Sequence, residues 1–170
     1  MLEKYFNDLE IEDSWTLVSI LKFLTNLTYH ELDSTILQLF IKNNLCGKLL
    51  KFEDYTRQLH SLTIVANLAA EPIISSHMLN NGLFKDIINL CYSLDEYIDQ
   101  SQKEMVVNKL ANICENVTYK ISPKYVDQSM KLCLFLSQAF VESDINSEIK
   151  LAATKSIYHL SMVSEEFVTE

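Results

Sequence analysis

The sequence is poor in glycine and proline, with two of each among 170 residues. Tight turns and phosphate-binding loops depend on glycine, because only glycine adopts positive φ angles without a steric cost. This scarcity argues against β-sandwiches, Rossmann folds and P-loops, and it favours long helices joined by short connections. The length lies within the range of one domain and allows a sizeable core without metals or disulfides.

Paired cysteines, long apolar runs and excess positive charge are also lacking. The four cysteines are widely spaced and form no Cys-x-x-Cys pair, so we expect buried thiols in a reducing compartment. No apolar run approaches the roughly 18 residues of a membrane span, and the residues after Met1 are not those of a signal peptide. A net charge of −9 disfavours binding to nucleic acid or anionic membranes. We therefore expect a cytoplasmic or nuclear protein that binds a basic or neutral protein partner.

Catalytic and metal-binding patterns are missing as well. The histidines show no metal-ligand spacing, no Gly-x-Ser-x-Gly is present, and no cysteine lies in a setting that activates a thiolate. An acidic cluster near the amino terminus has no apolar pocket implied around it, so we interpret it as a solvated surface. We expect no metal, no cofactor and no catalytic residues. The residues concerned are His30, His60, His77 and His159, and the acidic cluster is Asp8, Glu10, Glu12 and Asp13.

A seven-residue phrase recurs along the chain, with apolar residues at its first, fourth and seventh positions and a polar residue, usually asparagine, at its sixth. It occupies residues 21–27, 62–68, 107–113 and, more loosely, 154–160, and its polar residues are Asn26, Asn67, Asn112 and His159. These are separated by 41, 45 and 47 residues. A period of this length is typical of helical solenoids, in which each unit covers the apolar face of the next.

A second repetition supports the first. Residues 41–45, Ile-Lys-Asn-Asn-Leu, match residues 79–83, Leu-Asn-Asn-Gly-Leu, and both segments are followed by a pair of apolar residues. Asparagine and glycine tolerate the left-handed conformation that ends a helix, so both segments predict helix ends. Together with the apolar spacing, these signals predict helices at about 14–29, 33–41, 45–52, 54–68, 73–79, 83–93, 103–117, 123–141 and 144–163, with a polar linker at 94–102.

From about Trp15 to Val163, these features resemble armadillo repeats. The resemblance implies an all-α fold, a right-handed α-α superhelix of about four repeat units, some of them incomplete. The units would be residues 1–30, 31–70, 71–117 and 118–163 of a single domain spanning 1–170. HEAT repeats, or a mixture of the two types, remain an alternative. Residues 165–170 show no obvious polar capping helix, which is compatible with a longer repeat array.

The resemblance also implies a binding site. In armadillo proteins an asparagine near the end of the third helix lines a concave groove and holds the backbone of an extended peptide. The counterparts here are Asn26, Asn67, Asn112 and His159. One turn earlier, nuclear-import receptors of this family carry tryptophans that form pockets for lysine; here those positions hold Lys22, Thr63, Asn108 and Lys155. This difference argues against nuclear-localisation peptides and favours acidic or phosphorylated partners.

We therefore expect a non-enzymatic scaffold or adaptor that binds a peptide or helix of a partner protein in the groove. In one alternative, the amides join neighbouring helices inside the solenoid and do not face a ligand. In another, the uncapped ends of the solenoid make the contacts, and the chain is a structural or oligomerising subunit of a homo- or hetero-oligomer. An enzyme is the least favoured alternative, because no spacing predicts a cleft with perturbed titratable groups.

Overall fold

The computed structural model describes residues 14–52, 54–93, 99–119, 123–125, 130 and 147–168. This part of the chain is all-helical, and no strand occurs within it. The elements are α2 (Ser14–Thr28), α3 (Ser34–Lys42), α4 (Leu45–Leu49), α5 (Tyr55–Ala69), α6 (Pro72–Asn80), α7 (Leu83–Ser93), α8 (Gln100–Thr118), the 3₁₀ turn η2 (Pro123–Tyr125) and α10 (Ser147–Val168).

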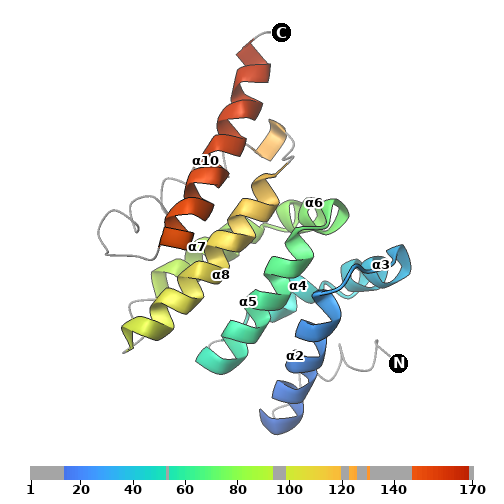
Figure 1. Cartoon of the computed structure of the whole chain (residues 1–170). Helices are drawn as coiled ribbons and strands as arrows, with labels where there is room; N and C mark the ends of the chain where they lie inside the picture. Colours follow the sequence, from blue (N-terminus) through green and yellow to red (C-terminus); the bar gives the residue numbers. More distant parts are fainter. Residues whose placement is uncertain are drawn as a thin grey trace.

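The four longest helices form a row in which all of them point the same way (Figure 1). The order is α2, α5, α8 and α10, and each packs against the next. The shorter helices complete the fold: α4 packs on α5, and α6 packs on both α5 and α8. The chain turns by 116° between α5 and α6, so α6 crosses the direction of the row. The core lies where the row helices meet one another and the shorter helices.

Neighbouring row helices have buried residues at matching helical positions. Leu21, Leu24 and Thr28 of α2 are buried, and so are the residues 41 positions later in α5. A further shift of 49 residues reaches the buried residues of α8. The α5 residues are Leu62, Val65 and Ala69, and those of α8 are Ala111, Cys114 and Thr118. A shift of 43 residues then relates Ile113 and Val117 of α8 to Ser156 and Leu160 of α10, which are also buried. Each inner helix is therefore covered from both sides.

The turns after α3 and α6 have the same structure, as the matching sequence segments predict. In each, the asparagine that follows the helix, Asn43 or Asn81, donates its side-chain amide to the carbonyl four residues earlier, at 2.8 and 2.7 Å. The next residue, Asn44 or Gly82, has a positive φ of 47° or 83°. Both predicted helix ends are confirmed.

Most other predicted helices end within a few residues of the observed ones, with clear exceptions. Helix α8 begins at Gln100, inside the predicted linker, because the carboxylate of Asp99 accepts the Ser101 N–H at 2.9 Å and caps the helix. Helix α4 ends at Leu49, earlier than predicted, and α10 begins at Ser147. The predicted helix at 123–141 starts with a 3₁₀ turn, and its remaining residues lie outside the described part except Met130.

No single described helix is long and apolar enough to cross a membrane. Helices α5 and α6 pass such a test only when they are taken together, and the bend of 116° separates them. More than half of the residues of α5 are buried, and helices α2, α4, α6 and α8 pack against it.

The left-handed conformation at the second turn gives a first prediction. Gly82→Ala should lower the free energy of unfolding by about 1–2 kcal/mol, because a Cβ atom disfavours positive φ even where the surrounding space is open. Asn44→Gly, at the matching position, should change it by less than about 0.5 kcal/mol, since glycine fits this conformation. Urea denaturation followed by circular dichroism measures both. Equal stability of Gly82→Ala and the wild type would argue against the turn.

Candidate protein-binding face

A side-chain contact joins the row helices at each junction, near their carboxyl ends. Between α2 and α5, Asn67 Nδ2 donates to Thr28 Oγ1 at 3.2 Å, while the Thr28 hydroxyl donates to a carbonyl of its own helix at 2.9 Å. Between α5 and α8, Asn116 Nδ2 donates to the Ala66 carbonyl at 2.9 Å. These amides satisfy polar groups between packed helices and so fix how far one helix is shifted along the next.

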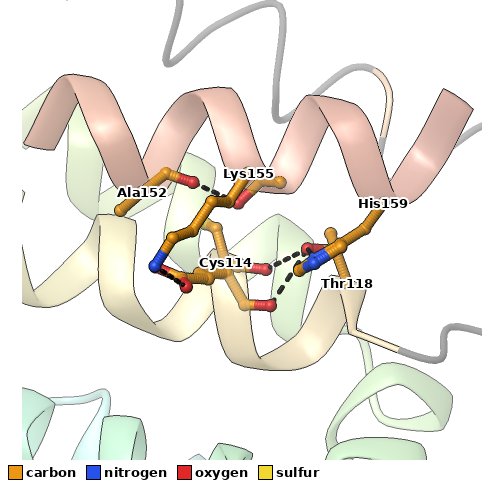
Figure 2. A network of polar contacts seen from close by, with 7 residues as sticks. Cys114, Thr118, Ala152, Lys155 and His159 are labelled. Carbon is orange, nitrogen blue, oxygen red and sulfur yellow. Dashed lines mark hydrogen bonds and ion pairs between the residues drawn. The ribbon is translucent and has the colours of Figure 1, made fainter.

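The junction between α8 and α10 uses a histidine in place of the amide (Figure 2). Thr118 Oγ1 lies 3.4 Å from His159 Nδ1 and donates to the Cys114 carbonyl at 2.7 Å. The threonine hydroxyl therefore accepts from His159 when the proton is on Nδ1. Nearby, Lys155 Nζ forms an ion pair with Glu115 Oε1 at 2.7 Å.

Three of the predicted binding residues, Asn67, His159 and Lys155, thus take part in contacts between helices. Asn67 and His159 each contact a side chain of the preceding helix, which is the structural role that we gave above as an alternative to binding a ligand. Asn112 behaves differently, because its amide donates to Asn108 Oδ1 of its own helix at 3.2 Å. Asn116 holds the position that corresponds to Asn67, as the shift of 49 residues shows. The sequence motif did not select Asn116, although residues 111–117 also fit the repeated phrase one turn later.

The remaining predicted residues line up across the row in a different grouping. Shifts of 41, 49 and 43 residues relate four of them, which therefore share one helical position; they are Lys22, Thr63, Asn112 and Lys155. Lys22 and Lys155 are exposed, whereas Thr63 and Asn112 are half-buried. Asn108 lies one turn before this line. Asn26 is exposed, and its side chain makes no hydrogen bond within the described part of the chain.

Exposed apolar side chains gather on the same helices. Among the described residues, ten large apolar side chains are exposed; nine lie on α2, α8 or α10 or directly follow α2 or α8, and the tenth is Ile73 of α6. The same shifts give Trp15 and Met105 one helical position, and Tyr29, Tyr119 and Met162 another. We call this surface the row face: Lys22, Thr63, Asn112 and Lys155, with Trp15 and Met105 toward the amino ends of the helices and Tyr29, Tyr119 and Met162 toward their carboxyl ends. Gathered exposed apolar residues with a polar component are typical of interaction sites.

His60 of α5 adds an electrostatic feature close to Lys22. Its pKa lies below the ordinary value near 6.5, mainly because partial burial disfavours the charged imidazolium, and also because the Lys22 ammonium repels it. The imidazole is therefore held in its neutral form more strongly in the folded chain than in the unfolded chain.

A concave feature lies among the shorter helices, away from the row face. A cavity of about 130 Å³ separates the α3–α4 turn from α6 and α7, and its lining includes Asn44, Cys46, His77 and Asp86. Burial raises the pKa of the Cys46 thiol to about 12, so this thiol stays protonated and is a poor nucleophile. Within the described ranges, no group of three histidine, cysteine or carboxylate side chains is placed to hold a metal ion.

Neither a protein-family model nor a curated protein matches the sequence. The interpretation of the row face therefore rests on the geometry of this chain.

The structural role of Asn116 is tested against Asn112 four residues earlier. The free energy of unfolding of Asn116→Ala should be about 1 kcal/mol lower than that of Asn112→Ala. Of these two asparagines, only Asn116 bonds to another described helix. Both changes bring the same gain in helix propensity, so the difference between the two variants compares the contact between helices with the bond that Asn112 makes inside α8. Urea denaturation measures it. Equal stabilities would contradict the register in which Asn116 corresponds to Asn67.

The lowered pKa of His60 predicts a dependence of stability on pH. Because the folded pKa is depressed, the contribution of His60 is fully present above the unfolded pKa near 6.5 and is lost as pH falls through it toward the folded value. The free energy of unfolding, measured between about pH 7.5 and 5.5, should fall less in His60→Gln than in the wild type. Lys22→Gln should reduce the fall only in part, since burial is the larger cause. An unchanged slope in His60→Gln would contradict this assignment.

Proposed function

We propose that this chain is a non-enzymatic interaction scaffold, built as an armadillo-like solenoid, that binds an extended peptide or a helix of a partner protein on the row face. The observation that carries the proposal is that five exposed large apolar side chains lie on the row face; they are Trp15, Tyr29, Met105, Tyr119 and Met162. A cytoplasmic or nuclear location and the lack of catalysis stay predictions.

The repeat arrangement is supported by two kinds of equivalence. The triplets α3–α4–α5 and α6–α7–α8 each consist of two shorter helices and one long helix, and the turns at Asn44 and Gly82 match in backbone conformation. Neighbouring row helices have buried residues at corresponding positions, under shifts of 41 residues from α2 to α5, 49 from α5 to α8 and 43 from α8 to α10. A unit of this kind covers its apolar face with the next unit, as in a solenoid.

The chemistry of the row face favours a peptide-like ligand. A side-chain amide both donates and accepts, so Asn112 is suited to pair with a peptide unit whatever side chain the ligand carries. Asn112 is available for this role because, among the described residues, its amide bonds only to Asn108 of α8, whereas Asn67 and His159 contact the preceding helix. Met105 and Tyr119 on either side of Asn112 supply apolar contact, as aromatic residues and methionine do at interface centres.

Charge further narrows the class of partner. The row face carries one lysine at each end. Lys22 of α2 is exposed, and Lys155 of α10 forms an ion pair with Glu115. An acidic or phosphorylated residue at the α2 end of the ligand would pair with Lys22, whereas the overall charge of −9 favours basic residues elsewhere in the partner.

The test changes the middle of the row face and leaves its ends intact. In the double variant Met105→Ser/Asn112→Ala, Met105 is exposed and Asn112 is half-buried with its amide bonded inside α8, so the helix content should remain that of the wild type. Proteins cross-linked to the wild-type chain in its native cells and identified by mass spectrometry should be recovered at least about tenfold less with this variant, as expected when central contacts are removed.

The matched control makes the same kinds of change away from the row face. Ile73→Ser/Ser76→Ala replaces an exposed apolar residue and an exposed polar residue of α6. It should retain the wild-type partners. Equal recovery of partners with the α8 variant, or equal loss with both variants, would refute the row face as the binding site.

A further inference from the structure

The two outermost helices of the row each show a face that the inner helices bury. On α10, Thr154 is exposed and Ile157 is 41% exposed. Their counterparts on α8 are Ala111 and Cys114, each 0% exposed because α10 packs there. Helix α10 thus presents, on its side away from α8, the surface that every earlier row helix uses to receive the next one. We call this side the tail edge, defined by Thr154, Ile157 and Ser161.

Ser161 of the tail edge makes the same hydrogen bond within its own helix as its counterparts in the earlier row helices. The hydroxyl of Ser161 donates to the carbonyl three residues earlier at 2.8 Å, as those of Thr118 and Thr28 do at 3.1 and 3.2 Å. In Thr28 and Thr118 the hydroxyl also contacts the polar side chain of the following helix. Ser161 is exposed and holds an oxygen that can accept a further hydrogen bond.

The complementary group lies at the other end of the row. Asn67 reaches back from α5 to α2, and Asn26 occupies the same helical position on α2. Asn26 is therefore directed away from α5, and it is exposed. We call this side of α2 the head edge, defined by Asn26. The head edge carries the amide donor of a junction, and the tail edge carries its hydroxyl acceptor.

We propose that the head edge of one molecule docks on the tail edge of a second copy of this chain and continues the row from molecule to molecule. In this contact Asn26 Nδ2 donates to Ser161 Oγ of the second copy, as Asn67 Nδ2 donates to Thr28 Oγ1 within the chain. Helix α2 of the first molecule covers Thr154 and Ile157 of the second copy. The contact is independent of ligand binding on the row face.

The match selects a head-to-tail contact over a symmetric one. All four row helices point the same way, so a second copy placed along the row keeps the parallel order of the internal junctions. Two tail edges that faced each other would oppose one hydroxyl with another, whether their helices ran parallel or antiparallel. A head-to-tail contact is heterologous, and it leaves a free head and a free tail after each addition unless the chain of molecules closes into a ring.

The test measures assembly by sedimentation velocity over a wide range of concentrations. The wild type should associate beyond the dimer, or into one closed ring, as concentration rises. Thr154→Arg blocks the tail edge and Asn26→Arg blocks the head edge, and each should weaken association at least about tenfold, because an arginine would be buried without a partner. Ser76→Arg on α6 places the same side chain at an exposed site away from both edges and should assemble like the wild type.

Mixing the two blocked variants decides the geometry. Asn26→Arg retains a working tail edge and Thr154→Arg retains a working head edge, so an equal mixture should form a dimer that does not grow. A wild type that stays monomeric up to about 0.5 mM would overturn the proposal. So would a mixture that remains monomeric, or full assembly of either blocked variant alone. Because Met105→Ser/Asn112→Ala leaves both edges intact, it should assemble normally even where it loses its partners. A failure of the assembly proposal can therefore be told apart from a failure of the proposed function.

Discussion

The fold depends on lateral burial between parallel helices. Each inner row helix carries apolar residues on two opposite sides, and neither side is covered by the helix itself or by the turns next to it. Leu62 and Val65 of α5, for example, are buried only because neighbouring helices lie against them. This requirement explains why the long helices form a row and why the surfaces at its two ends differ in kind from those inside. Both functional proposals, the row face and the edges, follow from it.

Apolar packing holds the helices together, but the polar contacts specify their register. The Asn67–Thr28 and His159–Thr118 contacts join side chains about forty residues apart, and each would be lost if one helix moved by a turn along the next. Asn116 reaches a backbone carbonyl instead, because its α5 neighbour at the threonine position is Ala69. The amides thus have a structural role at two junctions, which leaves Asn112 and Asn26 as the members of the predicted set that are open to a ligand or to another copy.

Much of the local structure could be predicted because its causes are local. Aspartates that cap helices, Pro72 at a helix start and the pair Asn44 and Gly82 act through a few neighbouring residues, so their signals are legible in the chain. The start of α8 was predicted too late because Asp99 lies in a polar segment that resembles a linker, although its carboxylate is placed to cap the helix. The interval between α5 and α8 was predicted one turn too short, since the repeated phrase fits α8 equally well at two positions.

The sequence by itself determined the helical class and the places where most helices begin and end, and it predicted a repeat of a little over forty residues. These follow from backbone preferences and from apolar spacing, which any short segment displays. Only the tertiary structure decided which asparagine belongs to which junction, which side chains remain exposed on the row, and that the two ends of the row carry complementary groups. Those properties depend on how one helix is placed against another, and the spacing within a single helix is the same for registers that differ by a turn.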